Sequence, residues 1–99
     1  MAERKLKPIH PGEVLREEFL KPFEISADTL AQSIGLQVQN IRKIISEEQS
    51  ITADVALRLA KFFGTSANFW LGLQSDYDLD VTQELLGEKL EKEIVPLAA

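Results

Sequence analysis

The fold of this chain is decided by residues 27–46, which read ADTLAQSIGLQVQNIRKIIS. Two short helical patterns meet at Gly35, which tolerates the positive φ that a tight turn between helices requires. Ala31 is small enough for two helices to cross closely at a steep angle. The apolar positions that would close a core beneath both helices are Leu30, Ile34, Leu36, Ile41 and Ile44. This spacing predicts a helix-turn-helix, whose second helix enters the DNA major groove, and leaves a plain helical hairpin as the alternative.

The outward side chains of the second predicted helix have the chemistry that reads base edges. They are Gln37, Val38, Gln39, Asn40, Arg42 and Lys43. Amides suit adenine, Arg and Lys suit guanine, and Val suits a thymine methyl group. The first helix of the pair adds Ser26, Thr29 and Gln32 as candidate donors to phosphates. All of these side chains would also serve as caps or solvated surface, and Arg42 could bind a phosphate or a glutamate.

The rest of the chain also has helical periodicity, and no segment alternates with the period of a strand. Pro11 suits a first helical turn, and Pro22 predicts the end of that first helix. Ser26 and Thr52 are suited to N-caps, and Gly64 is suited to end the helix that Thr52 begins. These residues predict four helices before residue 65.

Two further helices are expected after Gly64. Ser66 would cap a short fifth helix. Leu86, Leu90 and Ile94 lie at i, i+4 and i+8 and predict a weaker sixth helix, in which Gly87 costs about 1 kcal/mol.

The net charge of −5 on these 99 residues belongs to one part of the chain. Residues 1–75 hold nine basic and nine acidic side chains, whereas residues 76–99 hold seven acidic and two basic ones. DNA-binding domains are commonly basic, so the total charge on its own argues against nucleic acid. Read by position, it describes a neutral helical body with an acidic segment, and DNA binding is not excluded.

Composition excludes several other classes of protein. The chain has no cysteine, which excludes disulfides, a thiolate nucleophile, a zinc ribbon and an iron–sulfur site. The absence of cysteine also agrees with a cytoplasmic location. No apolar run approaches the roughly 20 residues that a bilayer span requires, and no apolar region of a signal peptide follows the N-terminal cations. We therefore expect a cytoplasmic protein with no membrane partner.

No pattern predicts catalysis, a cofactor or a metal site. His10 is the only histidine and suits the start of the first helix better than the role of a general base. Asp76, Asp78 and Asp80 mimic the first ligands of a calcium loop, but Val81 stands where that loop requires glycine. We expect a protein that is not an enzyme and holds no cofactor.

Motifs on both sides of the helix-turn-helix resemble the HigA-type antitoxins of the XRE group. They are HPGE at 10–13, ITAD at 51–54, ALRLA at 56–60, FGTS at 63–66, NFWLGLQ at 68–74 and YDL at 77–79, and the match covers roughly residues 8–80. The resemblance implies an all-α, five-helix phage-repressor-like domain, here with a short C-terminal helix or acidic tail. The expected segments are an N-terminal arm over 1–9, the helix-turn-helix domain over 10–80 and the acidic segment over 81–99.

The resemblance also implies the function. Such an antitoxin binds a small RelE-like ribonuclease toxin and represses its own operon, as a homodimer on double-stranded operator DNA, and it needs no small-molecule substrate. Two other functions remain open: a solitary phage-type transcriptional regulator without a toxin, and an interaction module that has lost DNA binding.

One departure from the family pattern follows the second helix of the motif. Family members commonly place glycine and then basic residues there, and this chain has Glu47, Glu48 and Gln49. The missing glycine puts the end of the helix in doubt. Two anions in place of cations should weaken contact with the phosphate backbone, so we expect a weak or highly selective DNA binder.

A dense apolar set near the end of the body is a candidate dimer interface. It comprises Phe69, Trp70, Leu73, Tyr77 and Leu79, of which most are expected in the core and the remainder at the seam. The acidic segment could neutralise a basic toxin or could simply be a solubilising helix. The N-terminal arm and the first helix are the other candidate contacts for a toxin.

Overall fold

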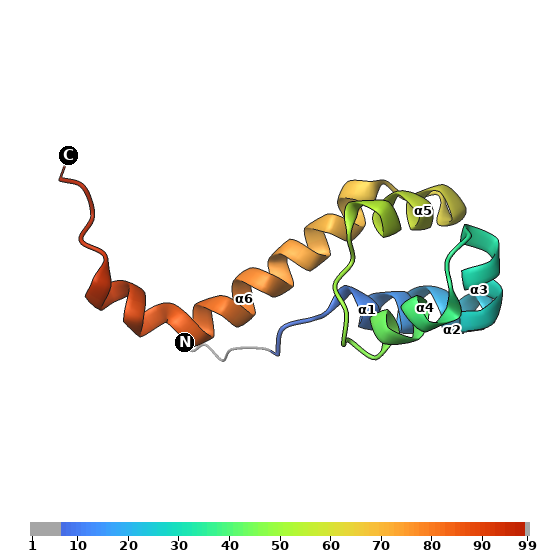
Figure 1. Ribbon diagram of the computed structural model, residues 1–99, viewed down its shortest axis with the longest axis horizontal. Helices are drawn as coiled ribbons and strands as arrows, with labels where there is room; N and C mark the ends of the chain where they lie inside the picture. Colours follow the sequence, from blue (N-terminus) through green and yellow to red (C-terminus); the bar gives the residue numbers. More distant parts are fainter. Residues whose placement is uncertain (1–6, 99) are drawn as a thin grey trace.

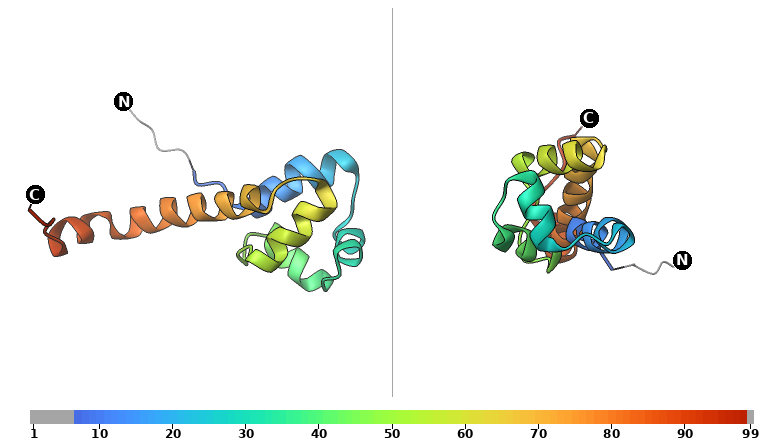
Figure 2. Two further views of the ribbon diagram at one scale, coloured as in Figure 1. Left: turned by 90° about the horizontal axis from the view of Figure 1, so that it is seen from above. Right: turned by 90° about the vertical axis from the view of Figure 1, so that its right-hand side faces the viewer.

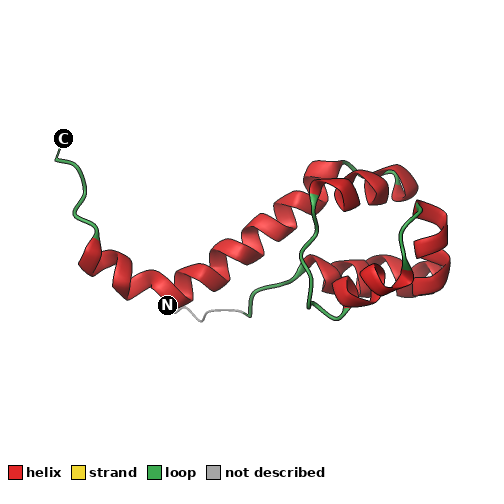
Figure 3. Ribbon diagram, in the orientation of Figure 1, coloured by secondary structure: helices red, strands yellow, loops and turns green. Residues whose placement is uncertain are grey.

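A computed structural model describes residues 7–98 and confirms the all-α prediction for them (Figures 1 and 3). The first helix is built from α1 (Pro11–Val14), η1 (Leu15–Leu20) and α2 (Lys21–Phe23), which are continuous. It is followed by α3 (Ala27–Ile34), α4 (Val38–Ile45), α5 (Ala53–Phe63) and α6 (Ala67–Glu93). The predicted N-terminal arm falls mostly on residues 1–6, which lie outside the described residues.

The first helix continues through Pro22, and the prediction that it ends there is wrong. Residues 15–20 form a π-helical turn, in which the Lys21 N–H donates to the Arg16 carbonyl five residues back. This wider turn relieves the clash that a proline ring makes with the preceding turn of an α-helix. The helix ends instead at Glu24, whose φ of 55° is left-handed.

The predicted caps of the next helices are confirmed. The Ser26 hydroxyl accepts the Thr29 N–H at 3.0 Å, and Thr52 and Ser66 accept N–H groups in the same way at the starts of α5 and α6. Gly35 ends α3 with φ 75° and Gly64 ends α5 with φ 78°. Such side-chain and left-handed caps satisfy backbone groups that a helix end leaves unpaired, which is why α3 and α5 begin and end, and α6 begins, where they do.

One core lies between the first helix, the helix-turn-helix, α5 and the start of α6. The large apolar side chains with almost no exposure include Leu15, Leu30, Ile41, Ile44, Leu59 and Trp70. The predicted core position Leu36 is only partly buried against this cluster. Burial on both α3 and α4 fixes the angle between them, so α4 presents one constant face to solvent.

The two helices expected at the C-terminal end form one helix, α6, of 27 residues. Gly87 does not interrupt it, because a penalty of about 1 kcal/mol is too small to break a helix that no proline interrupts. Only the first part of α6 packs against the body, with Trp70 and Gln74 buried, and the acidic part projects from it (Figures 1 and 2). No helix among the described residues has the length and hydropathy to cross a membrane.

Candidate nucleic-acid interface

The predicted base-reading residues lie in one turn and a half of α4 and at its N-cap. Gln37 is the N-cap, and Gln39, Arg42 and Lys43 are exposed. Val38 and Asn40 are half-buried, and Val38 also packs against the core. Ile41 and Ile44 anchor the opposite face of the helix in the core. The arrangement therefore offers amide and cationic groups on a rigid support, which major-groove recognition requires.

Two of the predicted phosphate donors are already part of a cap. The Ser26 hydroxyl accepts the Thr29 N–H and donates to the Thr29 hydroxyl, each at 3.0 Å. Both residues remain exposed at the N-terminus of α3, where backbone N–H groups also attract anions. Gln32 is exposed further along the same helix.

Arg42 is engaged with a carboxylate of the chain itself. Its Nη2 lies 2.9 Å from Oδ1 of Asp28, in the first turn of α3, and both side chains are mostly exposed. The sequence allowed Arg42 a phosphate or a glutamate, and its partner in the structure is an aspartate.

The doubt about the end of α4 is answered by Glu47. It adopts the left-handed conformation, φ 67°, that glycine would take. Its N–H donates to the Ile44 carbonyl at 3.0 Å, and the Glu48 N–H donates to the Lys43 carbonyl at 2.8 Å. These two bonds form a Schellman motif, which closes the helix without glycine.

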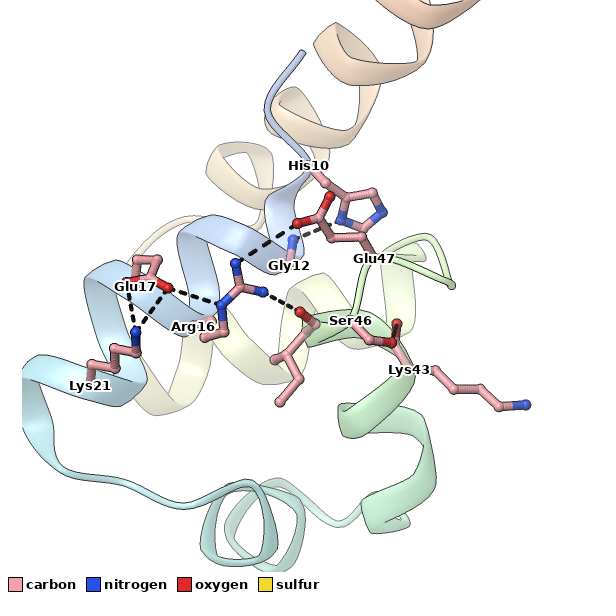
Figure 4. Close-up of polar contacts among 9 residues, drawn as sticks. His10, Gly12, Arg16, Glu17, Lys21, Lys43, Ser46 and Glu47 are labelled. Atoms are coloured by element: carbon pink, nitrogen blue, oxygen red, sulfur yellow. Dashed lines mark hydrogen bonds and ion pairs between the residues drawn. The ribbon is translucent and has the colours of Figure 1, made fainter. Parts of the chain in front are cut away.

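The Glu47 carboxylate points toward the first helix (Figure 4). It lies 3.8 Å from Nη2 of Arg16, whose Nη1 also donates to the Ile45 carbonyl at the C-terminus of α4. Glu48 instead stays exposed and accepts from the Ser46 hydroxyl. Glu47 and Glu48 are the two anions that depart from the family pattern, and of these Glu47 is partly neutralised by Arg16. Sequence analysis did not identify Arg16 as a partner. Lys43 extends away from this group (Figure 4).

The start of the first helix presses directly on the end of α4. His10 is buried and caps α1, with Nδ1 accepting the Gly12 N–H at 2.8 Å, which confirms its predicted structural role. A Cβ added at Gly12 would lie 1.8 Å from the Ile44 carbonyl oxygen. Burial lowers the pKa of His10, and the nearby Glu47 and Asp78 carboxylates oppose this effect. These contacts fix α4 from the side opposite its exposed face.

A second polar anchor, Gln74, was also missed by sequence analysis. It is buried on α6, where its Oε1 accepts the Ile51 N–H at 2.7 Å and its Nε2 donates to Asp78 at 3.0 Å. The only hint in the sequence was its place in the motif NFWLGLQ at 68–74. Gln74 ties the loop after α4 to α6.

The five candidate dimer residues differ in how much surface they offer. Trp70 is fully buried within the chain, and its indole N–H donates to the Thr65 hydroxyl at 2.8 Å, so it has no surface left for a partner. Tyr77 and Leu73 are half-buried, and the Tyr77 ring meets the His10 ring edge-on at 4.8 Å. Phe69 and Leu79 remain exposed.

Comparison with known proteins yields consistent matches. The family model described as helix-turn-helix matches residues 17–70. Virulence-associated protein I of Dichelobacter nodosus is 44% identical over 82 residues, covering 83% of this chain and 76% of that protein. Antitoxin HigA-1 of Vibrio cholerae is 35% identical over 79 residues, covering 80% and 74%. The structure of the Pseudomonas aeruginosa antitoxin HigA with the higBA promoter superimposes with a TM-score of 0.89 at 45% identity, covering 92% of this chain and 99% of that one.

Proposed function

Because the chain belongs to the helix-turn-helix family and, within it, to the HigA-type antitoxins, we propose that it represses its own operon and neutralises a RelE-like ribonuclease toxin by binding it. The observation that carries the proposed DNA binding is the exposed, polar face of α4. The opposite face of this helix is held by the core and by the start of the first helix. The protein acts by stoichiometric binding in the cytoplasm, without catalysis or a cofactor. A solitary regulator without a toxin is the alternative.

Sequence readout is assigned to α4 and positioning to α3. Gln39, Asn40 and Lys43 contact base edges in the major groove, assisted by Gln37, Val38 and Arg42. Ser26, Thr29 and Gln32 contact phosphates on the flank. Glu48 is exposed at a position where the family resemblance implies a cation, so the protein is a weak or highly selective binder. Tight non-specific binding with a steep salt slope would contradict this.

The protein acts on its operator as a homodimer. Paired half-sites about 34 Å apart require two recognition helices related by a two-fold axis. Phe69 and Leu79 supply exposed apolar contacts at the seam, flanked by Leu73 and Tyr77, and Trp70 supports them from the core.

The helix-turn-helix domain over 10–80 binds DNA, and the acidic segment over 81–99 faces the toxin. RelE-like toxins are basic, so a projecting acidic helix would steer such a partner and neutralise it. The backbone of this segment projects away from the body, because only the start of α6 packs against it (Figure 2).

Co-expression with the neighbouring gene tests both halves of the proposal. The neighbouring product should co-purify with this chain and, expressed alone, should arrest growth. The complex or the free chain should shift a duplex carrying their shared promoter. A chain that shifts the promoter without retaining the neighbour is a solitary regulator, and a chain that retains the neighbour but shifts no duplex is an interaction module.

A further inference from the structure

The pair between Asp28 and Arg42 joins the two helices of the motif on the face assigned to DNA. Asp28 lies in the first turn of α3 and Arg42 on the exposed face of α4, with 2.9 Å between Oδ1 and Nη2. The two side chains keep 71% and 57% of their surface exposed. The pair is thus held at the surface that would meet the duplex and is not part of the core.

An ion pair at this place changes what Arg42 contributes to binding. A free Arg beside DNA neutralises any phosphate, whatever the sequence, and so raises non-specific affinity. Arg42 held by Asp28 must give up this partner first, and the Asp28 carboxylate repels approaching phosphates. A bidentate contact to guanine is stronger than an exposed ion pair, whereas a single phosphate contact is comparable to it.

We propose that Asp28 is a specificity-determining residue, which withholds Arg42 from phosphates and releases it only where a base edge offers a better contact. This inference rests on the proposed DNA-binding function. It explains how a chain with few cations near α4 discriminates between sites: one of its two exposed cations there is restrained by a carboxylate on the neighbouring helix.

The chain contains a closely matched control, Asp54. Asp54 is the second residue of α5 after the N-cap Thr52, as Asp28 is the second residue of α3 after Ser26. It also pairs with an Arg at 2.9 Å, Arg58, which lies on its own helix α5. D28N and D54N therefore remove the same charge and the same interaction with a helix N-terminus, but only D28N breaks an ion pair between the two helices of the motif. Arg58 stays anchored in D54N, because its Nη1 also donates to the Ile34 carbonyl at 2.7 Å.

The test compares wild type, D28N and D54N by fluorescence anisotropy on two duplexes at rising salt. One duplex carries the sequence upstream of the chain's own gene, and the other is a scrambled sequence of equal composition. D28N should bind the scrambled duplex about three-fold more tightly at low salt, with a salt slope steeper by about 0.9, the value of one phosphate contact. Its preference for the upstream duplex should fall, and D54N should behave as wild type.

A second background isolates Arg42. In an R42Q chain, D28N should have a smaller effect on the scrambled duplex, since no Arg is released and only the repulsion between the carboxylate and the phosphates is removed. The inference is overturned if D28N matches D54N on the scrambled duplex, if it weakens binding to both duplexes, or if its effect is undiminished in R42Q. If wild type shows no preference for the upstream duplex, the proposed function is contradicted. The affinities of wild type and D28N for the scrambled duplex would still test whether Asp28 restrains Arg42. Thermal melts verify that all variants fold.

Discussion

The contact between Gly12 and the end of α4 leads to a sharp prediction for Gly12→Ala. The new Cβ would lie 1.8 Å from the Ile44 carbonyl oxygen and 2.8 Å from its carbonyl carbon. Real Cβ contacts essentially never fall below 3.0 Å, so the two backbones must separate by about 1.2 Å. Neither partner is a flexible side chain, and the strain cannot be relieved by a rotamer change.

The expected loss of stability is about 2–3 kcal/mol, at the upper end of what overpacking costs, because backbone meets backbone. For a domain of this size it corresponds to a fall in Tm of roughly 10–20 °C. Since the displaced segment is the end of α4, affinity for the promoter duplex should fall as well. Urea unfolding followed by circular dichroism measures the first effect, and anisotropy measures the second.

Gly87→Ala is the matched control for this substitution. Gly87 lies within α6, and no atom lies within 4 Å of a Cβ added there. Its replacement should therefore stabilise the helix by about 1 kcal/mol. If Gly12→Ala were as stable as wild type, or gained stability as Gly87→Ala should, the close approach of the first helix to α4 would be refuted.

Three further substitutions test the remaining polar contacts. Gln74→Leu removes the buried acceptor of the Ile51 N–H and should cost about 1–3 kcal/mol in urea unfolding, whereas a cost near zero would mean that water replaces the amide. Glu47→Gly should be more stable than Glu47→Ala by about 1 kcal/mol, because both variants lose the Arg16 contact and only Ala keeps a Cβ at φ 67°. Equal stabilities of the two variants would argue against the left-handed turn. Burial lowers the pKa of His10 in the folded chain below its unfolded value of 6.5, so the unfolded state binds more protons and stability should fall as pH drops below about 6.5. A His10→Gln chain should lose this part of the pH dependence in thermal melts, and an unchanged slope would exclude His10 as its source.

The caps and the helix-turn-helix core could be predicted because they depend on local sequence. Ser26 and Gly35 act on backbone groups within a few residues of themselves, and the apolar spacing around Ala31 follows directly from helical geometry.

The errors arose where a local rule met a non-local or unusual geometry. Pro22 normally ends a helix, but the π turn before it removes the clash. The continuity of α6 was missed because its buried side chains stop after the body, so the apolar pattern breaks although the backbone does not. Arg16 and Gln74 act on partners 29 and 23 residues away, Ile45 and Ile51, which no spacing rule connects.

One anisotropy titration distinguishes whether the exposed face of α4 reads the operator. The comparison is between wild type, Gln39→Ala combined with Lys43→Gln on α4, and Lys89→Gln in the projecting part of α6, all on the chain's own promoter duplex. The α4 double variant should lose at least ten-fold in affinity, since each base contact is worth about 1–3 kcal/mol, and Lys89→Gln should bind as wild type does. Undiminished binding by the double variant would show that Gln39 and Lys43 on α4 do not read the operator.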